Sequence, residues 1–257
     1  MKSMFSKAIV RIPGRNFAEG LTTVQLGVPL LEQVLAQHAQ YCEALQDCGL
    51  TVTTLEADLD HPDSTFVEDT AVVTSRSAML TRPGARSREG EVAAMRPVLL
   101  RLFPALTEIE APGTLDGGDI CEAGEHFFLG VSHRTNEEGA RQLAACLASN
   151  GFTSEVVNVR GIQSILHLKS GVSYIGENTL VVIEEMAGLF PGYERIVVTR
   201  EESHAANCVR VNDRVLVPAG YPRLPGELRE RGFDPLELEM SEFQKMDGGL
   251  SCLSLRF

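Results

Sequence analysis

Blocks of apolar and polar positions recur along the chain, and several of them end in the same way. Three long segments that mix polar and apolar residues stop at a glycine, which is followed by a short strand-like run. These are 29–48 with Gly49 and 50–55, 135–150 with Gly151 and 154–159, and 225–231 with Gly232 and 233–238. Glycine directly after the last helical residue is the usual left-handed helix stop. The pattern therefore predicts three helix–strand units.

A second pattern lies ahead of the helices, where two short apolar runs are joined by a turn. Residues 66–74 and 78–82 lead to Pro83-Gly84, and residues 206–211 and 214–218 lead to a similar Gly/Pro signal. The turns have hairpin composition. They are Ser75-Arg76, Gly124-Glu125, Gly176-Glu177 and Asn212-Asp213. The repeating unit is predicted to be strand, strand, helix, strand.

Counting these units gives four complete ones, over 66–110, 117–160, 170–198 and 206–238. A fifth is split, because 7–55 lacks only a first strand and a C-terminal strand over 250–257 can pair with 8–12. Five units average about 51 residues, a period typical of arrays and propellers. We predict one ring of ββαβ modules, a single domain over 1–257 closed across the termini. The weakest module is the one with 184–192, which is too short and glycine-rich for a full helix.

Composition and charge narrow the function classes. The 23 Lys+Arg against 35 Asp+Glu give a net charge of −12, which argues against nonspecific nucleic-acid binding because that needs a basic surface. Hydrophobic residues make up 44%, an ordinary globular value. Apolar runs are far shorter than the roughly 18 residues of a membrane span, so no membrane partner is expected. Residues 1–7 place a lysine where a signal peptide would be apolar, and a cytoplasmic location is predicted.

Six cysteines occur without any C-x-x-C pair. This spacing favours reduced thiols over disulfides or a zinc site. We expect at most one or two to be reactive, since most free cysteines are small core residues. They are Cys42, Cys48, Cys121, Cys146, Cys208 and Cys252.

The residues with chemical potential stand where the chain enters each module. The five entry segments are 61–69, 115–119, 165–169, 203–208 and 247–252. In a pseudosymmetric ring these equivalent positions meet at one end of the axis. Carboxylates, a histidine and a cysteine would then share one concavity, which is the usual form of a ligand or active site.

Taken singly, each of these signals has a plainer explanation. His167 among leucines is more often a core histidine, and Cys252 more often a buried small residue. The pairs Gly117-Gly118 and Gly248-Gly249 fit tight turns, and the acids between 58 and 69 fit a solvated face. Their joint placement at equivalent ring positions favours a site.

A cysteine nucleophile needs a base to form the thiolate, and the base needs a carboxylate to orient it. Cys252, His167 and Asp116 supply such a set.

Nearby acids bear on the substrate. Asp63, Glu68 and Asp69 would raise the pKa of the Cys252 thiol unless a cation neutralised them. A planar guanidinium pairs bidentately with carboxylates, and its carbon is a plausible target for sulfur attack. A guanidine substrate is therefore predicted.

Five motifs together resemble the dimethylarginine dimethylaminohydrolase family, over essentially the whole chain. The resemblance implies a five-bladed α/β propeller, which agrees with the ring of modules and gives the fold class: a five-fold pseudosymmetric α/β propeller. It also implies hydrolysis of N-omega-methylated L-arginines to L-citrulline and an alkylamine without a cofactor. Because the sequence shows no set of four metal ligands, no required metal is predicted. The motifs are F-V-E-D (66–69), T-R-P-G-A-x-S-R-x-G-E (81–91), A-P-G-T-L-D-G-G-D (111–119), R-T-N-E-E-G-A (134–140) and S-C-L-S-L-R-F (251–257).

The resemblance also implies a role for each matched position. The nucleophile would be Cys252, the general acid/base His167 and its acidic partner Asp116. Ligands of the substrate would be three acids, two arginines that hold its α-carboxylate, and two backbone positions at its amino-acid end. These substrate-binding positions are Asp63, Glu68, Asp69, Arg88, Arg134, Leu21 and Met246. The expected partner is a small methylated arginine, and the sequence leaves a homodimer open.

Three functions compete at this point. The first is the methylarginine hydrolase, favoured because Arg88 and Arg134 call for a substrate carboxylate. The second is a related deiminase or amidinotransferase acting on another guanidine; the larger arginine deiminases resemble this fold but carry a helical insertion for which 257 residues leave no room. The third is a guanidine-binding ring without catalysis, which the joint presence of cysteine, histidine and acid disfavours.

Overall fold

The strands of the computed structural model, which describes residues 5–103 and 105–257, form five sheets of three. In each sheet the first two strands are antiparallel and the last two are parallel. The sheets are β15(Leu255–Arg256)-β1(Lys7–Arg11)-β2(Thr51–Leu55), β3(Ala71–Val73)-β4(Ala78–Leu80)-β5(Leu106–Glu108), β6(Ile120–Ala123)-β7(His126–Val131)-β8(Thr153–Asn158), β9(Val172–Tyr174)-β10(Thr179–Ile183)-β11(Glu194–Val198) and β12(Val209–Val211)-β13(Arg214–Pro218)-β14(Asp234–Leu238). The ββαβ unit is confirmed.

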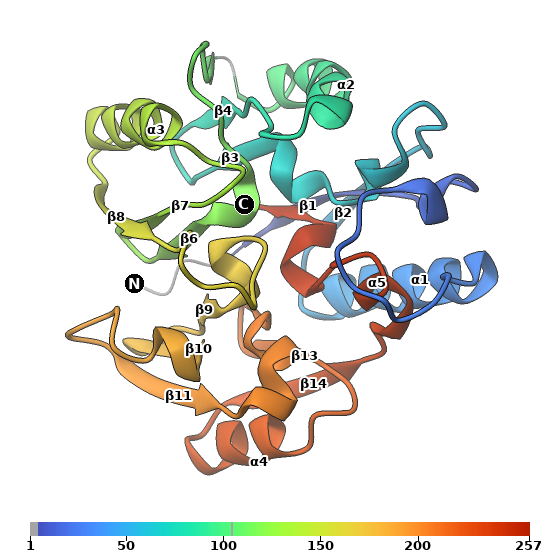
Figure 1. Cartoon of the computed structure of the whole chain (residues 1–257), viewed down its shortest axis with the longest axis vertical. Coiled ribbons are helices and arrows are strands. Elements are labelled where there is room, and N and C mark those ends of the chain that lie inside the picture. The colour runs from blue at the N-terminus through green and yellow to red at the C-terminus, as the bar shows by residue number, and fades with distance from the viewer. Residues whose placement is uncertain (1–4, 104) are drawn as a thin grey trace.

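The parallel strands of four sheets are joined by α-helices, which lie around the outside of the ring (Figure 1). They are α1(Leu31–Asp47), α2(Glu89–Leu100), α3(Glu137–Ser149) and α4(Arg223–Glu230); a short α5(Ser241–Gln244) follows β14. Between β10 and β11 only a 3₁₀ turn, Glu184–Met186, replaces the helix. The expectation that this module lacks a full helix is confirmed.

The ring closes where the two ends of the chain meet. Ala8 pairs with Arg256 and Ile9 with Leu255 in the antiparallel β1–β15 ladder. The predicted strand over 250–257 is too long, because Leu250–Leu253 forms a 3₁₀ helix. Its i,i+3 leucines lie on one side in such a helix, and both are buried in the core.

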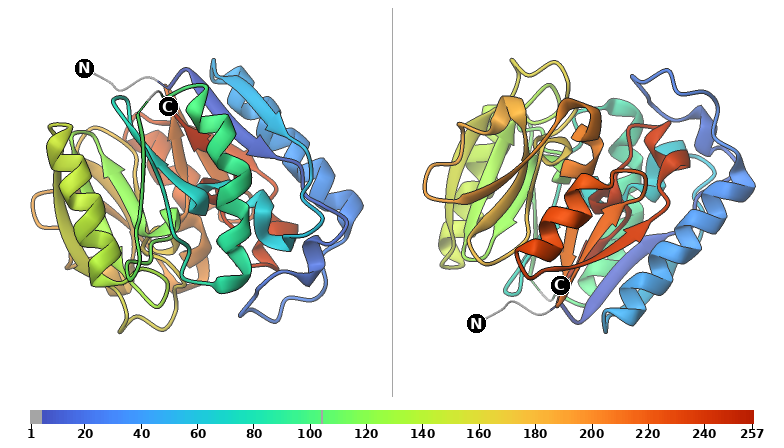
Figure 2. Two further views of the ribbon diagram at one scale, coloured as in Figure 1. Left: turned by 90° about the horizontal axis from the view of Figure 1, so that it is seen from above. Right: turned by 90° about the horizontal axis from the view of Figure 1, so that it is seen from below.

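Apolar side chains between each sheet and its helix make the core. In the third module, Ala140, Leu143 and Leu147 of α3 pack against Phe127 and Leu129 of β7. The helices lie outside the sheets in the side views as well (Figure 2). None of the helices in the described residues is long and apolar enough to cross a membrane. Residues 1–4, part of the segment behind the cytoplasmic expectation, lie outside those residues.

A short 3₁₀ helix stands just before the innermost strand of every module. Neighbouring ones contact each other in the order η9, η3, η5, η6, η8. The predicted meeting of the five entry segments is thus confirmed. They are η3(Val67–Thr70), η5(Gly117–Asp119), η6(Leu168–Ser170), η8(Arg200–Ala206) and η9(Leu250–Leu253). Residues 66–70 therefore do not belong to the predicted strand over 66–74, since β3 begins only at Ala71.

Candidate active site

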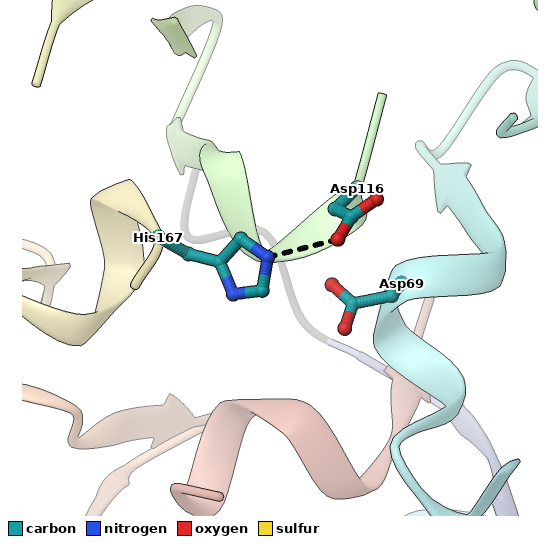
Figure 3. A group of neighbouring side chains, drawn as sticks. All are labelled: Asp69, Asp116 and His167. Atoms are coloured by element: carbon teal, nitrogen blue, oxygen red, sulfur yellow. Dashed lines mark hydrogen bonds and ion pairs between the residues drawn. The ribbon is translucent and has the colours of Figure 1, made fainter. Parts of the chain in front are cut away.

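His167 and Asp116 form the hydrogen bond that the sequence analysis expected. The His167 Nε2 lies 2.9 Å from Asp116 Oδ2 (Figure 3). Asp116 is fully buried, and its Oδ1 accepts the Gly84 backbone N–H at 2.8 Å. The carboxylate is therefore fixed from two sides, and the His167 Nδ1 points away from Asp116.

The glycine pairs of the entry segments lie in tight turns and also allow close approach of neighbouring segments. The Asp119 N–H donates to the Asp116 carbonyl at 3.0 Å across Gly117-Gly118, and the Gly249 carbonyl accepts the Cys252 N–H at 3.2 Å. A Cβ on Gly118 would lie 2.9 Å from the His167 ring, and one on Gly117 would lie 2.0 Å from the Glu68 carbonyl oxygen. One on Gly248 would lie 2.5 Å from the Phe66 ring. The tight-turn interpretation thus holds for Gly117 and Gly118, and the lack of a side chain at these glycines also lets the entry segments touch.

Asp69 is the acid nearest to this pair. Its Oδ1 accepts the Gly118 N–H at 2.7 Å, and its Oδ2 pairs with Arg88 Nη1. Burial alone would raise the pKa of Asp69, but His167 and Arg88 together lower it to about 2. Asp69 is therefore an anion at neutral pH.

Ligand atoms of Asp69, Asp116 and His167 all lie within 4.8 Å of one another, a spacing that a metal ion could use. Each carboxylate oxygen already accepts a hydrogen bond, from Gly118, Arg88, Gly84 or His167. The cluster thus works as a hydrogen-bond network. That no metal is required stays a prediction.

His167 carries a positive charge in this network. Burial acts to lower the pKa of its imidazole, but the carboxylates of Asp69, Asp116 and Asp119 outweigh it and raise the pKa to about 9. An imidazolium at neutral pH is a proton donor, not a base.

The Cys252 thiol is neutral because its buried, acidic surroundings raise its pKa. Burial and the charges of Glu68 and Asp69 raise its pKa to about 12, although the Gly249 N–H, 3.5 Å from the sulfur, and Lys169 favour the thiolate. This agrees with the sequence prediction of a raised thiol pKa. The site therefore holds a neutral thiol at Cys252 and an imidazolium at His167, and the charge of Asp69 acts on both.

Arg88 is turned inward and binds two acids. It is buried, and Glu91 accepts hydrogen bonds from its Nε at 3.0 Å and its Nη2 at 2.7 Å. Its Nη2 also reaches the Phe66 carbonyl at 3.1 Å, and its Nη1 reaches Asp69. A guanidinium has five N–H donors, so one Nη1 hydrogen has no partner among the described residues. Arg88 fixes Asp69 and keeps one donor for a ligand.

The other predicted carboxylate ligand, Arg134, is half-buried. In the part of the chain that the structure describes, its guanidinium forms no hydrogen bond or ion pair. Its charge acts on Asp63 together with that of Arg88. Both arginines thus act on the same buried acid.

Leu21 and Met246 are brought to the same end of the site. The Leu21 N–H donates to Asp63 Oδ1 at 3.0 Å. The following residue, Thr22, donates through Oγ1 to the Lys245 carbonyl at 3.0 Å. The segments that contain Leu21 and Met246 are therefore joined beside Asp63.

Glu68 forms the floor of the site. Its Oε2 accepts the Ser251 hydroxyl at 2.8 Å, and its Oε1 pairs with Lys169 Nζ at 2.5 Å and Arg256 Nη2 at 3.5 Å. Glu68 and Lys169 also line an axial cavity of about 410 Å³, together with residues of the innermost strands.

Lys169 was missed by the sequence analysis, although its position is informative. Glu68, Lys169 and Cys252 each stand three residues before an innermost strand, namely β3, β9 and β15. Modular register alone could have marked Lys169 as facing the axis.

A second missed residue is Asp119, which is fully buried. Its Oδ1 accepts the Leu168 N–H at 2.9 Å, next to His167, and its Oδ2 accepts the hydroxyls of Ser132 and Thr135. Asp119 therefore ties the histidine segment to the third module.

The acidic run splits into two groups. Asp60 is exposed, as the solvated-face interpretation expected, whereas Asp58 is half-buried and pairs with His61 at 2.9 Å. Asp63, Glu68 and Asp69 are only 4–6% exposed, so they belong to the site.

Sequence comparison relates the chain to known proteins. The chain is 45% identical to N(G),N(G)-dimethylarginine dimethylaminohydrolase of Pseudomonas aeruginosa, over 99% of this chain and 100% of the relative. The chain belongs to the dimethylarginine dimethylaminohydrolase family. It is also 36% identical to the Streptomyces coelicolor enzyme of the same name, over 97% and 96% of the two chains. A family model described as arginine deiminase matches residues 59–217.

Solved structures of the dimethylarginine dimethylaminohydrolase family agree. A Pseudomonas aeruginosa cysteine-to-serine variant in complex with citrulline superposes with a TM-score of 0.95 at 44% identity, over 99% of this chain and 100% of that chain. The N-terminal domain of a cyanobacterial arginine dihydrolase reaches 0.87 at 18% identity, over 99% and 97%; that likeness shows the fold alone. The predicted five-module propeller is confirmed.

Proposed function

We propose that this chain hydrolyses N-omega-methylated L-arginines, giving L-citrulline and methylamine or dimethylamine. The observation that carries the proposal is the meeting of a thiol, an imidazolium–carboxylate pair and buried acids at one end of the ring. The acids suit a guanidinium, and the thiol suits attack on its carbon. Related structures with citrulline and with an S-methyl-L-thiocitrulline adduct support the same chemistry.

In the first half-reaction the substrate cation pairs with the site acids, Asp69 among them. A positive charge beside the sulfur favours the Cys252 thiolate, and the thiol proton leaves to solvent. The thiolate attacks the guanidinium carbon, so a C–S bond forms. His167 then protonates the alkylated nitrogen, the C–N bond breaks and the amine departs. A covalent thiouronium remains on Cys252.

In the second half-reaction the neutral His167 takes a proton from water. The water oxygen attacks the same carbon, the C–S bond breaks, and the remaining hydroxyl proton passes to the departing sulfur, so citrulline and the Cys252 thiol are released. Asp116 keeps the ring oriented in both steps, because its carboxylate is itself fixed by Gly84. Orientation of this kind supplies a large share of the rate.

We assign the amino-acid end of the substrate to Arg134, the free Nη1 hydrogen of Arg88, and the backbone at Leu21 and Met246. Glu68 contacts the substrate through the second lone pairs of oxygens that also bind Ser251 and Lys169.

Arg134→Ala is expected to raise KM for dimethylarginine with little change in kcat. Losing one charge-assisted carboxylate contact costs on the order of 1.5–3 kcal/mol, or about 10- to 150-fold in KM. Arg88→Ala should lower kcat as well, because it also releases Asp69. Arg141→Ala removes an exposed arginine paired with Glu138 and serves as the control. Steady-state kinetics measures all three, and equal turnover of agmatine by the wild type would contradict the assignment.

A deiminase acting on plain arginine is the second candidate, favoured by the family model that matches 59–217. One assay separates the two functions. Citrulline formation is measured with dimethylarginine, arginine and agmatine at equal concentrations. Preference for arginine would replace the methylarginine assignment, and binding without citrulline would support a non-catalytic ring.

Turnover is expected to survive exhaustive dialysis against a chelator, because the four carboxylate oxygens of Asp69 and Asp116 already have hydrogen-bond partners. Metal content and citrulline release are measured before and after dialysis. Loss of activity that added metal restores would contradict this expectation.

We also propose that the chain is one cytoplasmic catalytic domain over 1–257. Its six cysteines are free, which suits a reducing compartment. Sedimentation equilibrium tests the homodimer that the sequence left open.

A further inference from the structure

The entry segment of the fifth module contributes an asparagine to the floor of the site. Asn207 follows η8 and is 5% exposed. Its Oδ1 accepts the Ser251 N–H at 2.9 Å, and its Nδ2 donates to the Ser251 hydroxyl at 3.1 Å and to the Lys169 carbonyl at 2.9 Å. Both ends of the amide are therefore used.

These bonds are part of a closed circuit. The Ser251 hydroxyl donates onward to Glu68 Oε2 at 2.8 Å, and Glu68 Oε1 pairs with Lys169 Nζ. The backbone carbonyl of Lys169 in turn accepts the hydrogen bond from Asn207 Nδ2, which closes the circuit. Four segments far apart in the sequence are thus joined at Ser251, the residue that precedes Cys252 in the chain.

The same asparagine sets the backbone path of the nucleophile. Gly249 lies against the Asn207 side chain, since a Cβ there would come within 2.5 Å of its Cγ. The Gly249 N–H is also the group that contacts the Cys252 sulfur, at 3.5 Å. Asn207 therefore contacts the η9 turn at Gly249 and Ser251, on the two sides of Leu250.

We propose that Asn207 is a positioning residue for Cys252: through Ser251 and Gly249 it holds the η9 turn so that the sulfur faces the substrate carbon. The inference rests on the proposed function, in which Cys252 is the nucleophile. An amide suits this place because it accepts from an N–H and donates to a carbonyl and a hydroxyl at once. A carboxylate at 207 could only accept.

The test is Asn207→Asp, which keeps the shape of the side chain. The new oxygen faces the Lys169 carbonyl and loses the Nδ2 hydrogen bonds, and it adds a negative charge to the acids around Cys252. We expect kcat for dimethylarginine to fall about 10- to 100-fold, as small misplacements of a reacting group do, with KM nearly unchanged. The rising limb of the kcat–pH profile should move to higher pH, because a nearby anion disfavours the thiolate.

Asn212→Asp is the matched control. Asn212 also joins two segments, since its Nδ2 donates to the carbonyls of Phe5 at 3.0 Å and Cys48 at 2.8 Å. It lies in the turn between β12 and β13, on the wall of the axial cavity. This variant should lose thermal stability as Asn207→Asp does, but keep the wild-type kcat and pH profile.

Ser251→Ala is the second variant, which decides the matter if Asn207→Asp does not fold. It removes the hydroxyl between Asn207 and Glu68 and keeps the Ser251 N–H bond, so kcat should fall in the same direction by a smaller factor. Alkylation of Cys252 by iodoacetamide is followed in every variant, because it reports the thiol without turnover.

The proposal is overturned if kcat and the pH profile of Asn207→Asp match those of Asn212→Asp at equal folded fraction. If Asn207→Asp does not fold, the proposal is overturned when Ser251→Ala keeps the wild-type kcat. Failure of the proposed function looks different. In that case the wild type forms no citrulline from dimethylarginine. Slower alkylation of Cys252 in Asn207→Asp than in Asn212→Asp would then still support the positioning role of Asn207.

Discussion

Cys252→Ser is expected to bind dimethylarginine and to release no amine above background. A serine hydroxyl needs a strong base to attack carbon, and His167 is protonated at neutral pH, since its carboxylate neighbours raise its pKa to about 9. The acids and arginines that we assign to substrate binding stay in place. Calorimetric titration should therefore show binding, while an amine-release assay shows none.

The control for this variant is Cys146→Ser. Cys146 is a half-buried free thiol on α3, outside the entry segments, and its replacement should leave turnover intact. In the wild type, rapid quenching followed by mass spectrometry should find the substrate-derived adduct on Cys252. An adduct on Cys42, Cys121 or Cys146, with Cys252 unmodified, would contradict the nucleophile assignment.

The unliganded enzyme is expected to react slowly with iodoacetamide at neutral pH. Burial, Glu68 and Asp69 raise the pKa of the Cys252 thiol from 9.0 to about 12. The site therefore contains about a thousandfold less thiolate at neutral pH than an unperturbed cysteine would give. Because the raised pKa favours the protonated form, the alkylation rate should keep rising with pH well above neutrality. A small amidinium that does not react and leaves the sulfur accessible should accelerate alkylation, because it supplies the missing positive charge.

Neutralising one acid separates the two roles of the acid cluster. Asp69→Asn should lower the resting thiol pKa and still reduce turnover, because substrate orientation is lost. Asp58→Asn, which removes an acid of the same run that pairs with His61 away from the site, should change neither. The pH dependence of thiolate absorbance measures the resting pKa. A value well below neutral would show a standing Cys252–His167 ion pair and would exclude substrate-assisted activation.

The sequence by itself determined the modular architecture of this protein. Glycine stops such as Gly49 and Gly151 have left-handed φ, which local chemistry alone requires, and hairpin composition at Asn212-Asp213 marks the turn between β12 and β13. The closing pair β1–β15 followed from counting modules, because a module without its first strand must obtain one elsewhere. Local propensity could not show that the entry segments are 3₁₀ helices, since short apolar runs such as 250–253 fit a strand equally well.

The site was predicted as a set of residues, and the tertiary structure decided what each of them touches. Glu68 and Ser251 are 183 residues apart and Asn207 and Ser251 are 44 apart, so no local pattern relates them. From the sequence, Arg88 was expected to bind a substrate carboxylate, whereas in the structure it pairs with Asp69 and Glu91. The charge states of Cys252 and His167 likewise depend on burial and on neighbours that only the closed ring brings together. Hydrogen-bond partners and pKa values are properties of assembled surroundings, whereas modules and turns are properties of the local chain.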